Sequence, residues 1–179
     1  MKLTQKTILL MVVVLAFVGT SLVMVYNRLG GDKEVEVLTG EDQTRLVLGR
    51  EFVGKQTSQE IQVFFEESRA MIREGKYAGE LAIVNYKVDT LASNQLAFFI
   101  GIHMEDRPAA IPDGFEVREF TGSRYYAAQL DMHPLVRPAP GDVEQQLVDA
   151  ALADGITLQN YFLELHFPDN TLRVEAYGE

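Results

Sequence analysis

The sequence predicts an α+β domain, in which a duplicated strand-helix-strand-strand unit forms an antiparallel sheet with two helices on one face, preceded by one transmembrane helix. Three observations lead to this prediction. The chain of 179 residues has a long uncharged apolar run near its start, and the rest has the composition of a globular domain. In that rest, the hydrophobic spacing of a strand, a helix and two further strands occurs twice in the same order. Two such units each supply part of one sheet and one helix.

The apolar run covers residues 7–26 and contains no charged side chain. As a helix rising about 1.5 Å per residue, it spans roughly 30 Å, the thickness of the hydrocarbon core of a bilayer. A cleaved secretory signal is the alternative, but its apolar core is about 7 to 15 residues long, and here the run continues past the small residues 19–21. We therefore expect residues 1–28 to be a single-pass anchor. Lys2 and Lys6 favour a cytoplasmic amino terminus, which places the domain outside the inner (cytoplasmic) membrane.

The first unit of the duplication follows residues 29–44, a polar, glycine-bearing stretch expected to be a flexible linker. A capping box of Thr57 and Glu60 begins its helix, apolar residues then recur at 3.6-residue spacing, and Gly75 ends it. Runs rich in β-branched and aromatic residues predict the strands. These strands are expected over 45–55, 80–88 and 95–105.

The second unit repeats this order. A turn at residues 112–114 leads into a long strand that is expected to bend or bulge at Gly122. Asp142 is the expected N-cap of the helix, and Gly155 ends it. The turn sequence Pro-Asp-Asn at 168–170 joins the last two strands. The strands are expected over 115–130, 161–167 and 172–177, so the domain covers residues 45–179.

Composition excludes several classes of function. The formal net charge is -10, and residues 1–28 hold three of the 16 basic side chains and none of the 26 acidic ones, so the domain itself is strongly acidic and we expect no nucleic-acid binding. The chain has no cysteine, and its three histidines lie on separate elements, so we expect no metal site. Fingerprints of nucleotide and dinucleotide binding and of serine hydrolases are absent, and we expect no cofactor and assign no catalytic residue.

The last two expected strands carry the candidate ligand-binding residues. Side chains alternate between the faces of a strand, so Glu164 and His166 share a face, as do Glu175 and Tyr177. A carboxylate flanked by rings complements an amphipathic or cationic organic molecule. Tyr126 on the long strand adds a ring from the opposite half. A sheet whose polar face meets solvent accounts for the same pattern, and the sequence leaves both interpretations open.

In the order of these motifs the chain resembles the GyrI-like domain, the effector-binding domain of bacterial transcription activators. The similarity covers about residues 45–179 and rests on three short stretches, 112–127, the closing Glu164-Leu165-His166 and Glu175-Ala176-Tyr177. The resemblance implies a groove between two pseudo-symmetric halves, with aromatic walls and a glutamate from a closing strand. His166 stands where the family has tyrosine, and the apolar helix stands where the activators carry their DNA-binding domain.

The leading hypothesis is a membrane-anchored protein that binds a small amphipathic or cationic organic ligand in this groove, and that is a binder rather than an enzyme. One alternative is a hydrolase of a small organic compound, with a groove glutamate as general base and His166 as its partner. The other is an envelope interaction module, whose acidic surface docks on a protein partner.

Overall fold

The computed structural model describes residues 5–88 and 90–179, with side chains from Leu9 onward. Within this range the chain separates into two compact units. One contains the amino-terminal helix, residues up to 34, and the segment 131–137; the other contains residues 35–130 and 138–179.

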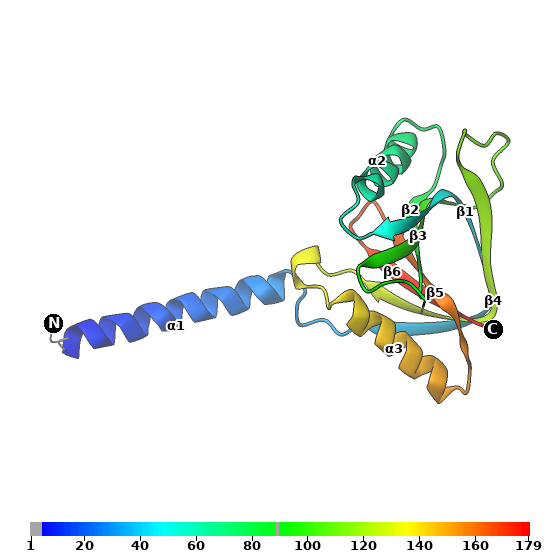
Figure 1. Ribbon diagram of the computed structural model, residues 1–179. Helices are drawn as coiled ribbons and strands as arrows, with labels where there is room; N and C mark the ends of the chain where they lie inside the picture. The colour runs from blue at the N-terminus through cyan, green and yellow to red at the C-terminus, as the bar shows by residue number, and fades with distance from the viewer. Residues whose placement is uncertain (1–4, 89) are drawn as a thin grey trace. The chain divides into compact units, whose positions relative to one another are not determined.

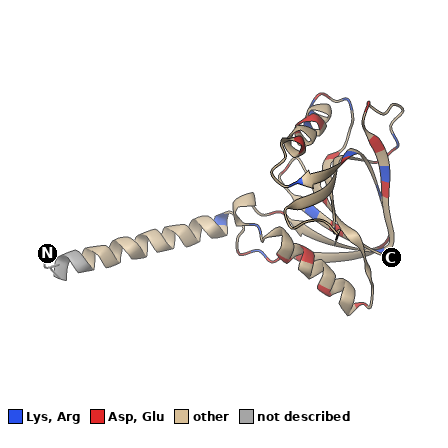
Figure 2. Cartoon of the chain, in the orientation of Figure 1, with Lys and Arg blue, Asp and Glu red and all other residues tan. Residues whose placement is uncertain are grey.

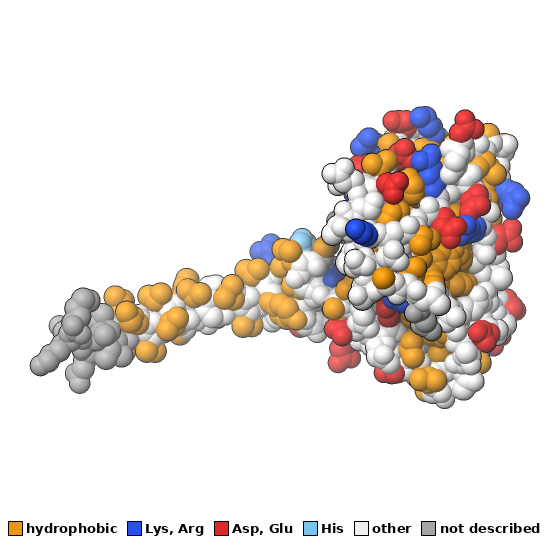
Figure 3. Space-filling model, viewed as in Figure 1, with side chains coloured by type: hydrophobic (Ala, Val, Ile, Leu, Met, Phe, Trp, Pro, Cys, Tyr) orange, Lys and Arg blue, Asp and Glu red, His pale blue; other side chains and the backbone are white. Residues whose placement is uncertain are grey.

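The first unit is dominated by one apolar helix, α1, over Gln5–Arg28. Its stretch Leu9–Arg28 has a mean hydropathy of 2.5 and no buried residue, and it is long enough and apolar enough to cross a membrane, a test that a signal sequence also passes. From Leu9, where the described side chains begin, no charged side chain lies along this helix before Arg28 (Figure 2), and hydrophobic side chains cover it (Figure 3). The short 3-10 helix η1, Pro134–Val136, belongs to the same unit.

The second unit is a closed six-stranded antiparallel barrel with two helices on its outside (Figure 1). The expected order of strands and helices is confirmed, and the sheet in addition closes on itself. The strands are β1 (Glu36–Lys55), β2 (Glu80–Tyr86), β3 (Gln95–Met104), β4 (Glu116–Leu130), β5 (Leu158–His166) and β6 (Leu172–Gly178). The helices are α2 (Gln59–Arg73) and α3 (Pro140–Ala153).

The strand order β1-β3-β2-β5-β6-β4 makes the duplication visible in space. Each half contributes three adjacent strands, β1-β3-β2 from the first and β5-β6-β4 from the second, and equivalent strands meet at both seams, β2 with β5 and β1 with β4. Helix α2 packs against the first half and α3 mainly against the second. The two halves are therefore related by pseudo-two-fold symmetry, as the repeated pattern predicts.

Strand β1 begins at Glu36 and not at Arg45, so residues 36–44 are strand rather than linker. This amino-terminal part pairs with β4 along its whole length. Val37 and Val47 would share a face in a regular strand, yet Val37 packs beside α3 and Val47 lies in the barrel interior. The change of phase falls near Asp42, whose φ of 51° lies in the left-handed region, opposite the expected irregularity at Gly122.

The helix starts differ slightly from those predicted. The N-cap of α2 is Ser58, whose hydroxyl accepts a hydrogen bond from the Glu60 backbone, instead of Thr57. Helix α3 begins with Pro140, which presets the helical φ, so Asp142 lies in the first turn rather than at the cap. Both helices end at the expected glycines, Gly75 and Gly155, which adopt positive φ.

The core has an inner and an outer part. The inner cluster lies inside the barrel and takes residues from all six strands: Val47, Ala82, Val84, Phe99, Phe120, Tyr161, Leu163, Leu165 and Tyr177. An outer cluster lies between α3 and the strands beneath it, including Tyr126, Phe162, Val143, Leu147 and Val174. The inner cluster contains no helical residue. The face of the sheet that carries no helix is therefore the one that lines the barrel interior.

Candidate functional site

Aromatic rings line the barrel interior in a continuous row. Phe99 lies 6.1 Å from Phe120, Phe120 lies 5.3 Å from Tyr161, and Tyr161 lies 5.8 Å from Tyr177, measured between ring centroids. Tyr125 continues the row beyond Tyr177 at 6.5 Å. These spacings are those of interacting ring pairs. Four of these rings come from the second half and Phe99 comes from the first, so the row extends across both halves of the barrel.

A buried carboxylate stands at one end of this row. Glu175 on β6 is fully buried. The Arg45 guanidinium on β1 donates to it through Nε at 3.0 Å and Nη2 at 2.7 Å, the two-pronged geometry of a strong charge-assisted pair. The Tyr177 hydroxyl donates to the same carboxylate at 2.5 Å, and Arg173 Nε lies 2.8 Å from its Oε1. One carboxylate is thus shared by two guanidinium groups and a phenol.

These contacts determine the charge state of the cluster. Burial alone would raise the pKa of the Glu175 carboxyl, but the hydrogen bonds from Arg45 and Tyr177, with the charges of Arg45 and Arg173, outweigh burial and lower that pKa. Burial and the neighbouring carboxylate raise the pKa of Tyr177 well above its ordinary value. Burial also raises the pKa of Tyr161 to about 12. Glu175 is therefore ionised and both phenols are neutral at neutral pH.

A second polar group lies further along the inward face, at Arg118 on β4. Its guanidinium donates to the Tyr86 hydroxyl at 3.1 Å and to Glu51 at 2.9 Å, and it also pairs with Glu116. The same guanidinium stands 4.5 Å above the centre of the Phe99 ring, a cation–π distance. The interior therefore combines rings with charged groups at two places.

The structure separates the five residues that the sequence singles out. Glu175 and Tyr177 point into the barrel and contact each other. Glu164 and His166 lie on the outer face of β5, with His166 Nε2 3.3 Å from a Glu164 oxygen. The reason is the register: Glu164 pairs with Val174, whose side chain packs outward beside α3, and not with Glu175.

Tyr126 also points outward. It is fully buried beneath α3, and its hydroxyl donates to Asp154 at 2.9 Å, just after the end of that helix. The inward ring from this strand is Tyr125. Tyr126 thus connects α3 to the outer face of the sheet. The Glu175 cluster lies on the inner face, so the sheet separates the two.

Sequence reasoning missed Arg45, Arg118 and the ring of Tyr161 as members of the interior. Arg173 carries a signal, since it shares the alternating face of Glu175 and Tyr177. Arg45 carries none, because it meets Glu175 only through the closure of the sheet, 130 positions apart in the chain. No group of three or more metal-ligating side chains occurs among the described residues.

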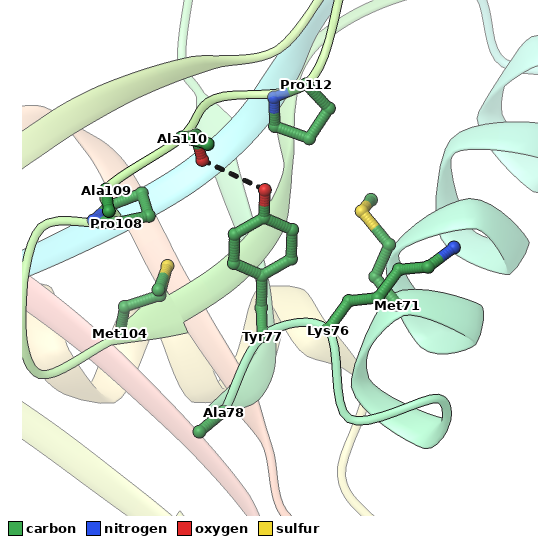
Figure 4. Close-up of a pocket in the computed structure, with 9 residues that line it drawn as sticks. All are labelled: Met71, Lys76, Tyr77, Ala78, Met104, Pro108, Ala109, Ala110 and Pro112. Carbon is green, nitrogen blue, oxygen red and sulfur yellow. Dashed lines mark hydrogen bonds between the residues drawn. The ribbon is translucent and has the colours of Figure 1, made fainter.

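A hollow of about 600 Å³ lies outside the barrel, between the end of α2, the loop that leads to β2 and the loop between β3 and β4 (Figure 4). None of the five residues expected from the sequence lines it.

No protein-family model matches the sequence, and the comparison with curated proteins found no match. Solved structures resemble its fold. The C-terminal domain of EcmrR superposes with a TM-score of 0.52 at 10% identity, covering 80% of this chain and 96% of that one. EcmrR in its complex with DNA gives 0.54 at 10% identity, covering 98% and 71%. SAV2435 bound to tetraphenylphosphonium gives 0.47 at 11% identity, covering 82% and 94%.

At these identities the similarity concerns the fold alone. The barrel has the fold of the EcmrR C-terminal domain, which agrees in fold with the resemblance drawn from the sequence motifs.

Proposed function

We propose that this chain is a membrane-anchored protein that binds a small amphipathic organic molecule inside the barrel, and that it acts by binding rather than by catalysis. The observation that carries the proposal is the Glu175 cluster: a fully buried carboxylate, with two arginines and a tyrosine, at the end of a row of aromatic rings. Rings supply contact area for the apolar part of a ligand, and the charged groups fix the orientation of its polar part.

The stability of the fold does not require such a cluster. Well-packed apolar residues of similar volume are often as stabilising as a buried ion pair, or more so. The cluster is therefore weak evidence for a purely stabilising role, and we assign it a role in ligand binding. The side chains of Arg45 and Arg173 are 18% and 20% exposed, so the polar end of the interior meets solvent at these two residues.

Helix α1 supports the anchoring part of the proposal. Its length and hydropathy suit one bilayer crossing. With the amino terminus in the cytoplasm, as Lys2 and Lys6 favour, the barrel is held outside the cytoplasmic membrane and samples small molecules there. Its acidic charge argues against nucleic acid as a partner.

The hydrolase alternative receives less support. A general base that works near neutral pH needs a pKa close to that pH, whereas the pKa of Glu175 is lowered and its oxygens already accept hydrogen bonds. His166, its suggested partner, lies on the opposite face of the sheet.

The proposal is tested by screening small aromatic compounds against the full chain in detergent micelles, with protein-free micelles as the reference, and by comparing two matched variants. Glu175→Gln and Glu164→Gln make the same change on paired strands, one inside the barrel and one outside. We expect Glu175→Gln to weaken each confirmed hit at least tenfold and Glu164→Gln to change affinity less than twofold. Equal affinities in both variants would reject the interior as the site.

Because Glu175→Gln also removes a buried partner, a second variant guards against loss of folding. Tyr125→Leu removes an inward ring that is partly buried and that contacts the ring of Tyr177 and the guanidinium of Arg173, while the pair between Arg45 and Glu175 stays in place. The same hits are expected to bind it more weakly, while its circular dichroism matches that of the wild type.

A further inference from the structure

The hollow outside the barrel has the lining of a ligand pocket. We call it the α2 groove, and its walls are Met71, Lys76, Tyr77, Ala78, Met104, Pro108, Ala109, Ala110 and Pro112. Its volume of about 600 Å³ lies within the range of small-molecule sites. A neighbouring hollow of about 420 Å³ shares Ala78 and Met104 with it, so the two hollows are adjacent, and we call them together the depression.

The walls of the α2 groove are mostly apolar and are positioned from both sides. Met71 comes from α2 and Met104 from the end of β3, and unbranched thioether side chains adapt to ligands of different shape (Figure 4). Between them stands the ring of Tyr77, whose hydroxyl donates to the Ala110 carbonyl at 2.9 Å. This hydrogen bond connects Tyr77, which forms the floor of the groove, to the loop that carries Pro108 and Pro112.

The neighbouring hollow adds negative charge to one end of the depression. Glu105 and Asp106 line it, both are exposed, and neither forms an ion pair or hydrogen bond with any residue that the structure describes. The other charged residues that line the two hollows have partners: Glu80 lies 2.9 Å from His103, and Lys76 lies 2.8 Å from Glu74. Among the residues that line the two hollows, the charge without a partner is therefore negative.

The barrel interior is a less favourable site for a cationic ligand. There a cationic ligand would have to displace Arg45 from a two-pronged pair, or compete with Arg173, for a carboxylate that is already shared. In the hollow beside the α2 groove, Glu105 and Asp106 have no such partners among the described residues, and no contact of theirs has to break.

From this contrast we propose that the α2 groove is a second binding site, separate from the barrel interior, for a small organic cation that carries an apolar ring. The ring packs between Met71 and Met104 over Tyr77, and the ammonium group lies beside Glu105 and Asp106. This site does not depend on the interior, and either one can exist without the other.

The test compares two probes of one shape and opposite charge, 2-naphthylmethylammonium and 2-naphthoate, titrated into the full chain in a neutral detergent with protein-free micelles subtracted. The ammonium is expected to bind more tightly than the carboxylate. In the double variant Glu105→Gln with Asp106→Asn, its affinity is expected to fall about tenfold, because two exposed charge contacts are lost. Ala78→Phe, which fills the depression at the residue common to both hollows, is expected to weaken the ammonium as well.

A matched control removes the same charge elsewhere. Glu36→Gln with Asp142→Asn neutralises two exposed acids that line neither hollow, and a change of less than twofold is expected. The proposal is overturned if the ammonium does not bind, if it binds no more tightly than the carboxylate, or if the control weakens it as much as the groove variant. It is equally overturned if Glu175→Gln weakens the ammonium and the groove variant does not, since the cation would then occupy the barrel.

Discussion

The alternation of side chains along β6 directs Glu175 into the barrel. In β6 the inward residues are Arg173, Glu175 and Tyr177, and the residues between them pack against α3. The same alternation in β5 sends Glu164 outward. Two glutamates on neighbouring strands thus have different environments, one without solvent and one at the surface of the sheet.

Removing the charge at Glu175 should destabilise the barrel. Glu175→Gln leaves Arg45 and Arg173 without their common counter-ion in a poorly solvated place, and a loss of about 3 kcal/mol in the free energy of unfolding is expected. Urea denaturation of the full chain, followed by the fluorescence of its tyrosines, measures this loss. Glu164→Gln, at the half-buried outer pair, should lose less than about 1 kcal/mol; a similar loss in both variants would mean that the arginines do not depend on Glu175.

The same cluster makes stability depend on pH. The pKa of Glu175 is lower in the folded chain than its ordinary value of 4.5, so its ionised form stabilises the fold at neutral pH. That contribution is expected to be complete above pH 4.5 and to disappear as the pH falls below 4.5 through the folded pKa. The free energy of unfolding, measured between pH 7 and pH 3, should therefore fall less in Glu175→Gln than in the wild type. A steeper fall in the variant would contradict the lowered pKa.

Glycines control how closely β1 approaches β3. Gly49 and Gly101 face each other across the two strands. A Cβ on Gly101 would lie 2.0 Å from the Leu48 carbonyl oxygen, and a Cβ on Gly49 would lie 2.6 Å from that of Ile100. The register runs unbroken past Gly49, so these glycines serve close packing and not a bulge.

Gly101→Ala is expected to lower the free energy of unfolding by about 3 kcal/mol, because the contact is with backbone that has to shift. Gly141→Ala is the matched control. Its Cβ would meet open space in the first turn of α3, and it should be neutral or stabilising by up to about 1 kcal/mol. Thermal denaturation of both variants compares them; an unchanged melting temperature for Gly101→Ala would mean that the strands separate more easily than the pairing indicates.

Local pattern was sufficient to predict most strands and both helices of the barrel. The 3.6-residue spacing in α2, the glycines that end the helices and the Pro-Asp-Asn turn before β6 are all signals within a few residues. Residues 36–44 gave no such signal, since acids, Gly40 and Asp42 interrupt the apolar alternation, and their extended form depends on β4. The sequence of one segment alone does not predict its pairing with a distant segment.

The candidate site was predictable to the same extent. Alternation alone identifies Glu175 and Tyr177 as neighbours on one face, but it does not say which face of β5 lies against them. The face that meets Glu175 is set by the register between β5 and β6. In this register Glu164 and His166 lie on the outer face of the sheet. The contribution of Arg45 follows from barrel closure, to which no local pattern corresponds.

The proposed anchor is testable on the intact chain. Val13→Arg with Val14→Arg places two charges near the middle of α1, and each is worth about 2.5 to 3.5 kcal/mol against insertion at the centre of a bilayer. We expect the variant to leave the membrane fraction for the soluble fraction on ultracentrifugation. Val13→Leu with Val14→Leu keeps the segment apolar and should stay in the membrane fraction. Complete membrane retention of the arginine variant would show that α1 is not what holds the chain there.

Strand β1 ties the two copies of the duplication together. Its later part pairs with β3 of its own copy and its earlier part with β4 of the other, so each copy supplies hydrogen-bond partners that the other lacks. A chain cut between Met104 and Glu116 would leave unpaired strand edges on both fragments, and it would separate Phe99 from the other four rings of the aromatic row. The barrel should consequently melt in a single cooperative transition, and the two fragments should regain native structure only when mixed.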